Sequence, residues 1–365
     1  MRNILPIILL IHFVFCTTDV KSQNSLAEIL NLQSEPKVYA ATKTNQTIII
    51  DGKLDSAWEK ASWSTTFVDI EGENKEKPPY STRFKMLWDE EHLYIYSILN
   101  EPHIWGTLKQ KDTIIYHNND FEIFLKPKLS SPLYYEIEIN TLNTIMDLLM
   151  PKPYRLGGQA IMHWDAKDLK SAIHVEGTLN NPSDTDQYWA VELAIPYKSL
   201  RSFGSRPTPK PNEYWRINFS RVQWQHEIKE GKYYRKKLND KILPENNWVW
   251  SPIGLINMHY PERWGFIHFT ENSVSESLPA MYKLEKLAWN IFYLQQIAFK
   301  KHKKYTADIK SLEGYDKLLK PYLDKYTIQL STYNDSNFFY ILVKEKNSKY
   351  YFTIDKLGNY YTNYE

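Results

Sequence analysis

Apolar and polar residues alternate with a period of two along most of residues 47–269, and this pattern predicts short β-strands. In the segment 134–140, for example, apolar positions alternate with the polar positions Glu136, Glu138 and Asn140, which would share one face of a strand. Roughly ten such segments, separated by loops with Pro and Asn and without a long amphipathic helix, are typical of a β-sandwich. We therefore expect an all-β antiparallel sandwich over residues 38–271.

The pattern changes near residue 272. From residue 282 to residue 304, apolar residues recur every three or four positions, which predicts one long helix. Lysines at its end suit the negative pole of the helix dipole. Three alternating segments follow and predict a small antiparallel sheet, so we expect a C-terminal α+β module over residues 272–365.

The first 22 residues have the composition of a signal peptide, because a positive charge precedes an apolar run of suitable length. We expect cleavage after Ser22, a linker over residues 23–37, and no transmembrane segment in the mature chain. The protein would then be periplasmic, cell-surface or extracellular. An uncleaved anchor is one alternative, and a lipoprotein attached through Cys16 is another, although Phe15 is bulky where a small residue is wanted.

The composition excludes several kinds of site. Cys16 is the only cysteine, so a mature chain would have no disulfide, zinc–thiolate site or cysteine nucleophile. The net charge of +2 does not provide the basic field of a nucleic-acid-binding protein. The 12 Trp, 27 Tyr and 15 Phe residues suit sugar binding as well as core packing, since pyranose faces stack on aromatic rings.

No strong catalytic motif is present, so the carboxylates become the candidate chemistry. Asp120 and Glu122 share one face of a predicted strand, and Glu136 and Glu138 share a face of the next. If the strands are neighbours, these residues could form a glycosidase pair, since such carboxyls stand about 5–5.5 Å apart in retaining enzymes. They could equally accept hydrogen bonds from sugar hydroxyls, hold calcium, or form a solvated strand face.

Over about residues 38–269, the chain resembles the family 9 carbohydrate-binding modules and their exported relatives. The resemblance rests on the order of the blocks "IIIDGKLDSAWEKA", "FKMLWDEEHLYIYSILNEP", "YHNNDFEIFLKP", "YYEIEINTLNTIMDL", "YWAVELAIPYKSL", "WRINFSRVQW", "NWVWSP" and "PERWGFIHF". It implies a β-sandwich that binds the ends of sugar chains and carries structural calcium.

The resemblance also implies a sugar-binding site. Its first stacking aromatic falls on Tyr116 where the best-known members have Trp, and its glutamate falls on Glu122. The family's second Trp falls near Met258, so Tyr116 and Tyr260 together would have to replace the usual pair of tryptophans. The full set expected to bind carbohydrate is Tyr116, Asn118, Asn119, Asp120, Glu122, Glu138, Asn140, Asn257, Met258, His259 and Tyr260.

Two departures from the family stand out. The family's Arg is replaced by Glu138, which reverses the charge at this position. The polar loops 155–159 and 177–186 are extra, and we expect them to shape the pocket or to bind calcium through Asp184 and Asp186, whose spacing suits loop ligands.

We therefore expect a non-catalytic carbohydrate-binding protein that serves the capture or degradation of polysaccharide. Its partners would be polysaccharides or oligosaccharides and enzymes of carbohydrate catabolism. The alternatives are a glycoside hydrolase that uses two of the four carboxylates, and a surface adhesion protein whose sandwich has no sugar ligand.

Overall fold

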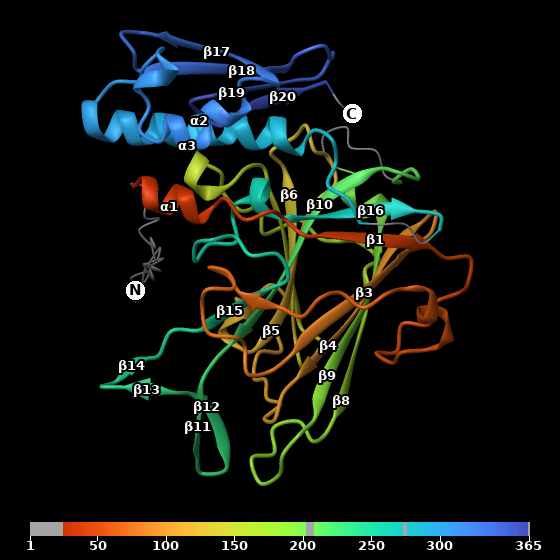
Figure 1. Cartoon of the computed structure of the whole chain (residues 1–365). Helices are drawn as coiled ribbons and strands as arrows, with labels where there is room; N and C mark the ends of the chain where they lie inside the picture. The colour runs from red at the N-terminus through yellow and green to blue at the C-terminus, as the bar shows by residue number, and fades with distance from the viewer. Residues whose placement is uncertain (1–24, 202–207, 273–275, 364–365) are drawn as a thin grey trace, which may run out of the picture.

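The computed structural model describes residues 25–201, 208–272 and 276–363 (Figure 1). The expected signal peptide and Cys16 lie outside these residues. A curled β-sandwich forms the larger part of the molecule, and a helix with a small sheet lies across one end of it (Figure 1).

The sandwich is one 12-stranded sheet with the order β7-β6-β5-β10-β16-β1-β3-β4-β9-β8, and β15 joins β10 to β2. The strands are β1 (Val38–Lys43), β2 (Val68–Asp69), β3 (Thr82–Trp88), β4 (His92–Asn100), β5 (Asp120–Lys126), β6 (Tyr134–Asn140), β7 (Ile145–Met150), β8 (Lys170–Glu176), β9 (Tyr188–Pro196), β10 (Tyr214–Gln223), β15 (Asn246–Val249) and β16 (Gly265–Thr270).

The expectation of a mainly β fold is confirmed, with one correction to the strand directions. β1 pairs in parallel with both β16 and β3, so the sheet is mixed rather than wholly antiparallel. No tight hairpin joins β1 to either neighbour, so loop geometry does not force the antiparallel direction there.

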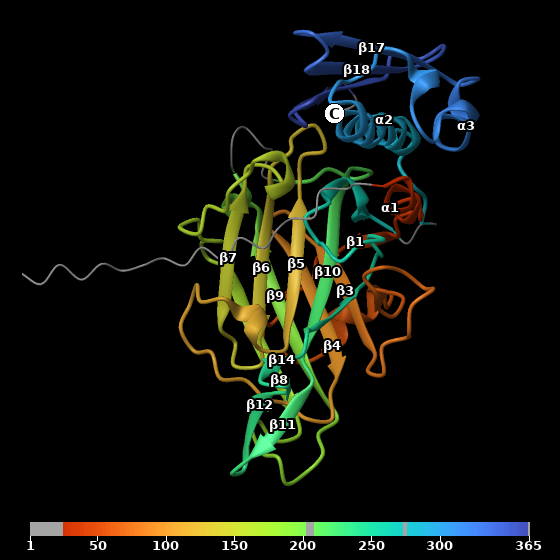
Figure 2. The same cartoon turned by 90° about the vertical axis from the view of Figure 1, so that its left-hand side faces the viewer.

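The sheet curls so that β7, β6, β5 and β10 form one layer and β3, β4, β9 and β8 form the other (Figure 2). Aromatic and aliphatic side chains fill the space between the layers. On β5, Phe121, Ile123 and Leu125 point into this core and are fully buried. Because side chains alternate along a strand, Asp120 and Glu122 lie on the opposite face.

Short elements connect and extend the sandwich. They are the hairpins β11 (His226–Lys229) with β12 (Lys232–Arg235) and β13 (Lys237–Leu238) with β14 (Lys241–Ile242), and the 3₁₀ turns η1 (Ser56–Lys60), η2 (Ile115–His117), η3 (Tyr154–Leu156), η4 (Tyr197–Leu200) and η5 (Pro261–Arg263).

The C-terminal part contains one long helix and a small antiparallel sheet, as the sequence predicted, but the sheet has a fourth strand in addition to the three expected. Its elements are α2 (Tyr282–His302), η6 (Ile309–Ser311), α3 (Tyr315–Leu318), η7 (Lys320–Tyr322), β17 (Tyr326–Tyr333), β18 (Phe338–Glu345), β19 (Tyr351–Asp355) and β20 (Tyr360–Thr362). In the described part of the chain, no helix combines the length and the apolar character needed to cross a membrane.

Helix α2 lies between the small sheet and the sandwich (Figure 1). A single apolar cluster joins the three, since it contains Phe124 and Trp264 of the sandwich, Trp289 and Leu287 of α2, and Phe339 of β18. The outer face of the β5–β6 layer is therefore covered at this end. The domain boundary at residue 272 stays a prediction, although the two parts share this cluster.

The segment that we expected to be a linker is partly helical. Helix α1 (Leu26–Asn31) begins with a capping box, in which Ser25 and Glu28 exchange side-chain-to-backbone hydrogen bonds. Ile29 and Leu32 are fully buried in the cluster that contains α2. The polar composition of residues 23–37 concealed these two apolar anchors.

Candidate functional site

Four acidic side chains lie together on the outer face of β5 and β6. Glu122 is the direct cross-strand partner of Glu138, while Asp120 pairs with Asn140 and Glu136 with Phe124. Carboxylate oxygens of Asp120, Glu122 and Glu138 lie within 4.8 Å of one another. All four acids are buried, and even Glu136 is only 6% exposed. We call Asp120, Glu122, Glu136 and Glu138 the acidic cluster.

Burial and mutual repulsion make these acids hard to ionise. Burial raises the pKa of Glu122 to about 7 and, together with the charge of Glu122, raises the pKa of Glu136 to about 8. The pKa values of Asp120 and Glu138 are also raised well above the usual range, first by burial and then by the charge of Glu122. The acidic cluster is therefore not the solvated strand face that was one of the initial alternatives.

Two half-exposed tyrosines lie near the acidic cluster. Tyr116 in η2 is 38% exposed, and its backbone N–H donates a hydrogen bond to Glu138 Oε2 at 3.0 Å. Tyr154 in η3 is 40% exposed, and its ring meets the ring of His259 edge-on at 4.7 Å. Burial raises the pKa of Tyr154 to about 12, with further contributions from the charges of Glu136, Glu138 and Tyr116. Tyr154 and Tyr116 therefore lie on the same side of the molecule.

Three predicted sugar ligands have structural hydrogen bonds instead of exposed side chains. The Oδ1 atoms of Asn118 and Asn140 each accept two backbone N–H bonds from nearby loops, at 2.8–3.1 Å. Asn119 donates to Glu101 at 3.2 Å and accepts from the backbone of Trp224 at 2.8 Å. Each asparagine is at most 2% exposed. Their role in sugar binding stays a prediction, and these contacts account for them as loop anchors.

The segment 257–260 lies next to Tyr154, but the Tyr260 ring in this segment is buried. Tyr260 is 3% exposed, and the Arg155 guanidinium lies 4.3 Å from the centre of its ring. Met258 is also buried. His259 Nδ1 lies 2.6 Å from the Tyr134 hydroxyl, and burial lowers the pKa of His259 to about 4.

Tyr154 is thus the second exposed aromatic ring at this site, whereas Tyr260, which the sequence suggested for this role, is buried. The sequence contained one signal for it. Tyr154 directly precedes the extra polar loop 155–159 that we expected to shape the pocket.

The aspartates expected to bind calcium in the loop 177–186 have other partners. Both carboxylate oxygens of Asp186 accept backbone N–H bonds at 2.7 Å, one from Ile104 and one from Thr178. Asp184 accepts a hydrogen bond from the Thr178 hydroxyl. Calcium binding by these residues stays a prediction, and the observed bonds account for them as loop-ordering residues.

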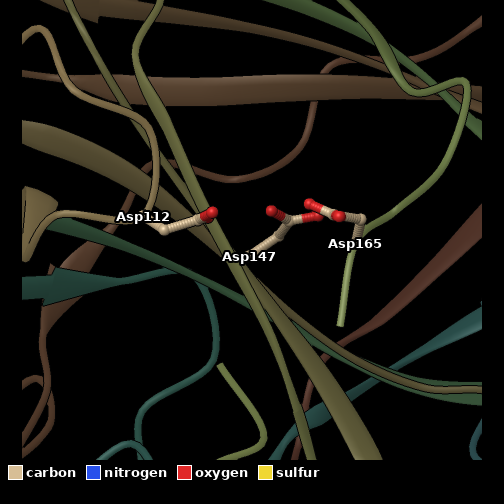
Figure 3. Close-up of side chains that lie close together, drawn as sticks. All are labelled: Asp112, Asp147 and Asp165. Atoms are coloured by element: carbon tan, nitrogen blue, oxygen red, sulfur yellow. The ribbon is translucent and has the colours of Figure 1, made fainter. Parts of the chain in front are cut away.

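A second group of acids lies at the edge of the sandwich. Asp112, Asp147 and Asp165 point toward one another from three segments of the chain (Figure 3). The Lys111 ammonium group forms an ion pair with each of them, at 2.9 Å to Asp147 and 3.1 Å to Asp112. Burial alone would lower the pKa of Lys111. The hydrogen bonds to the three aspartates outweigh this effect, so the pKa of Lys111 is raised overall. This group therefore already contains its counter-charge.

The hydrolase alternative needs a carboxyl pair with room for a sugar between or beside its members. Glu122 and Glu138 are cross-strand neighbours, but they are 5% and 2% exposed. A cavity of about 750 Å³ lies elsewhere, between the sandwich and the start of α2, and it is lined by residues such as Lys128, Tyr214 and Tyr282. The geometry of the acidic cluster therefore does not resemble an open catalytic cleft.

Comparisons with known proteins agree with the sequence blocks. Residues 50–213 match the family model described as "Carbohydrate family 9 binding domain-like". The resemblance to this family is confirmed for these residues. The match includes Tyr116, Tyr154 and the acidic cluster, whereas the segment 257–260 lies beyond it.

One relative and two solved proteins are similar to parts of this chain. An endo-1,4-beta-xylanase C of Paenibacillus barcinonensis is 30% identical over 161 residues, which cover 44% of this chain but only 12% of the xylanase. A family 9 carbohydrate-binding module of Caldicellulosiruptor kristjanssonii, solved with glucose, is 15% identical with a TM-score of 0.38, covering 67% of this chain and all of the module.

A candidate carbohydrate-binding protein of Bacteroides uniformis is 15% identical with a TM-score of 0.47, covering 64% of this chain and 99% of its own. At these TM-scores, the fold assignment rests on the strands and their register instead.

Proposed function

We propose that this protein binds carbohydrate without cleaving it and serves the capture or degradation of polysaccharide. The observation that carries the proposal is the family match over residues 50–213, which includes both exposed tyrosines. The Caldicellulosiruptor module in this family was solved with glucose and with cellotriose. A glucose-containing chain is accordingly the first ligand to test.

The proposed binding surface is the side of the sandwich that carries Tyr116 and Tyr154. Both rings are more than a third exposed, so each can present an apolar face to a pyranose. His259 lies beside Tyr154, and the Asn257 side chain accepts a hydrogen bond from the His259 backbone, so both residues supply polar groups for sugar hydroxyls near this ring. A sugar chain that contacts both rings would reproduce the family's two-aromatic arrangement, with tyrosines in place of the tryptophans.

The buried acids fit a binding protein better than a hydrolase. A retaining hydrolase needs its nucleophile in contact with the sugar, and Glu122 and Glu138 are almost completely covered. Release of reducing sugar from plant and algal polysaccharides is the direct test of this point. We expect none above the background of a Glu122→Gln, Glu138→Gln variant, and release that this variant abolishes would establish the hydrolase instead.

The binding proposal is tested with a glycan array and isothermal titration calorimetry on the chain from residue 23 onward. We expect binding to at least one class of poly- or oligosaccharide. Titration of glucose, cellotriose and xylan oligosaccharides then ranks the ligands. A chain that is folded by circular dichroism and binds no glycan would refute the proposal and favour a structural or adhesive role.

Export to the periplasm, the cell surface or the exterior accompanies the proposal, because a polysaccharide-binding protein must meet its ligand there. Action alongside glycan-degrading enzymes is also part of it, and the match to a segment of a xylanase supports this. Co-purification with secreted glycoside hydrolases would test the partnership.

A further inference from the structure

Two short hairpins, β11–β12 and β13–β14, project from the sandwich and carry an excess of positive charge (Figure 1). We call residues 226–242, which form them, the basic arm. Within the arm, residues 232–241 contain five basic side chains and one acid, although the net charge of the whole chain is only +2. The basic residues of this stretch are Lys232, Arg235, Lys236, Lys237 and Lys241.

The positive charge of the basic arm is not balanced by its surroundings. Lys229 pairs with Glu227 at 2.8 Å, but within the described parts of the chain none of the five basic side chains of residues 232–241 forms an ion pair. The four lysines among them are exposed, and Arg235 is half-buried. Lys111, by contrast, forms ion pairs with three aspartates. The side chains of the basic arm are therefore able to bind an anionic partner.

Both hairpins hold their basic side chains on well-defined strands. The two loop residues of β13–β14, Asn239 and Asp240, have φ values of 49° and 59°. Those of β11–β12, Glu230 and Gly231, have φ values of 51° and 68°. Positive φ at both positions is what a type I′ turn requires, and this turn suits the twist of a tight hairpin. A partner that binds the basic arm therefore has less backbone to order.

The base of the arm lies against Tyr116, one of the two exposed rings of the proposed sugar-binding surface. The Trp224 indole N–H donates a hydrogen bond to the Tyr116 carbonyl at 2.7 Å, and the Arg235 guanidinium lies 4.6 Å from the centre of the Trp224 ring. Burial and then the charge of Arg235 lower the pKa of His117, whose ring meets that of Tyr116 edge-on at 4.9 Å. The charge of Glu245 acts on His117 in the opposite direction. A guanidinium group therefore lies close to the Tyr116 surface.

This neighbouring charge bears on which sugars suit the surface at Tyr116. An exposed tyrosine ring stacks on neutral and acidic pyranoses alike. Arginine binds carboxylates and other oxyanions through paired N–H donors, and lysine binds them as a point charge. Polysaccharides with uronate carboxylates or sulfate esters present such groups repeatedly along the chain, whereas chains of glucose present none. Charge complementarity therefore favours an acidic polysaccharide.

We propose that this protein binds an acidic polysaccharide, with a sugar ring stacked on Tyr116 and the carboxylate or sulfate groups of neighbouring sugars bound by Arg235 and the lysines of the basic arm. The inference rests on the proposed function and names the class of ligand for the same surface. The basic arm lies beyond residues 50–213, which match the family model, so the family match assigns it no role.

The experiment compares ligands that share a backbone and differ in charge. Calorimetry at low and at high NaCl concentration titrates the chain from residue 23 onward with cellohexaose, with the same hexamer carrying C6 carboxylates, and with the same hexamer carrying C6 sulfates. Polygalacturonate and its carboxyl-reduced form provide a second backbone. Inorganic polyphosphate tests for unspecific attraction of polyanions.

Two variants remove charge from the basic arm. One is Arg235→Gln, and the other combines Lys236→Gln with Lys237→Gln, both of which are exposed and can change without a loss of packing. The matched control combines Lys300→Gln with Lys301→Gln, two exposed lysines in the last turn of α2. Circular dichroism verifies that each variant is folded.

On at least one backbone, we expect the charged ligand to bind about tenfold more tightly than the neutral one, and this advantage to shrink at high NaCl because salt screens exposed charges. The ranking of carboxylate and sulfate forms identifies the acid group. Each arm variant should reduce the advantage of the charged ligand at least about threefold, and the α2 control should retain it.

Equal or weaker binding of the charged ligand on both backbones would overturn the inference. So would an advantage that both arm variants keep, a loss confined to the α2 control, or polyphosphate that binds as tightly as the charged glycans. If only neutral glycans bind, the proposed function stands and this inference alone fails. If no glycan binds, both fail.

Discussion

Arg216 of β10 and Glu285 of α2 form a buried ion pair, with Nη2 and Oε2 2.9 Å apart. The Arg216 side chain is fully buried and Glu285 is 7% exposed. Arg216 also donates a hydrogen bond to the backbone carbonyl of Trp264 at 2.7 Å, and its guanidinium lies 3.9 Å from the centre of the Phe266 ring. One arginine thereby connects the sandwich to the C-terminal helix.

Glu285→Ala should destabilise the whole chain, because it leaves the Arg216 charge buried without a partner. Removal of one member of a buried pair typically costs about 3–5 kcal/mol. Urea denaturation followed by tryptophan fluorescence measures the loss. As a control, Glu285→Leu combined with Arg216→Met removes both charges and should cost less than Glu285→Ala. An equal or greater loss in the double variant would show that packing, and not the unpaired charge, dominates.

Deletion of residues 272–365 tests the predicted boundary between the two parts. The deletion removes α2 from the shared apolar cluster and exposes Phe124, Tyr134 and Trp264. We expect the truncated chain to bind the dye ANS, to melt at a lower temperature and to aggregate more readily than the full chain. A truncated chain that stays monomeric with an unchanged melting temperature would support the separable module that the sequence suggested.

The sequence predicted best where a local pattern decides the structure. The alternation of Phe121 and Glu122 correctly assigned the two faces of β5, because side-chain direction follows from the backbone alone. The parallel pairing of β1 with β16 was not predictable, since pairing partners separated by more than 200 residues depend on the global fold. The linker interpretation of residues 23–37 did not identify α1, because the segment is short and its burial depends on packing against α2, which the local sequence does not reveal.

The candidate site was predicted only in part, because local sequence patterns do not reveal which side chains the rest of the fold covers. The sequence placed Glu122 and Glu138 together only if β5 and β6 are neighbours, and the two strands do pair, but the burial of the two acids depends on segments that cover the face from elsewhere. Tyr260 lies close in sequence to Met258, on which the family's second Trp falls, yet Arg155 and the apolar cluster cover its ring. Exposure is a property of the assembled structure, so the exposed Tyr154 could not be distinguished from the buried Tyr260 by sequence alone.

The acidic cluster predicts an unusual dependence of stability on pH in the presence of chelator. Below about pH 4.5, Glu122 is protonated in both the folded and the unfolded state and contributes nothing. Between that value and its folded pKa of about 7, the unfolded chain loses the proton and the folded chain keeps it. The free energy of unfolding must therefore fall as the pH rises through this window, by on the order of 3 kcal/mol for this one group.

Thermal melts in EDTA at pH 5 and pH 8 measure this effect. Glu136, with a folded pKa of about 8, extends the fall to higher pH, and Asp120 and Glu138 on the same face act in the same direction. A Glu122→Gln, Glu136→Gln variant should lose less stability between the two pH values than the wild type. The prediction would be contradicted if the wild type in EDTA were more stable at pH 8 than at pH 5 and the variant showed the same change in stability.

The sugar-binding surface is tested most directly at its two exposed rings. Tyr116→Ala and Tyr154→Ala each remove a stacking face, and an aromatic anchor typically contributes about 2 kcal/mol or more to binding when it is a hot spot. We therefore expect each change to weaken the binding of the best glycan by roughly 30-fold, since every 1.4 kcal/mol corresponds to a factor of about ten. Both variants should melt near the wild-type temperature, because neither ring is buried in the core.

Tyr340→Ala is the matched control, because Tyr340 is also 38% exposed but lies on β18 in the C-terminal sheet. It should leave glycan affinity unchanged, as should Tyr333→Ala on the neighbouring strand β17. Calorimetry with one defined oligosaccharide compares all four variants under the same conditions. If the Tyr116 and Tyr154 variants bind like the wild type while Tyr340→Ala loses affinity, the sugar binds to the C-terminal sheet and the family's two-aromatic site is not used in this chain.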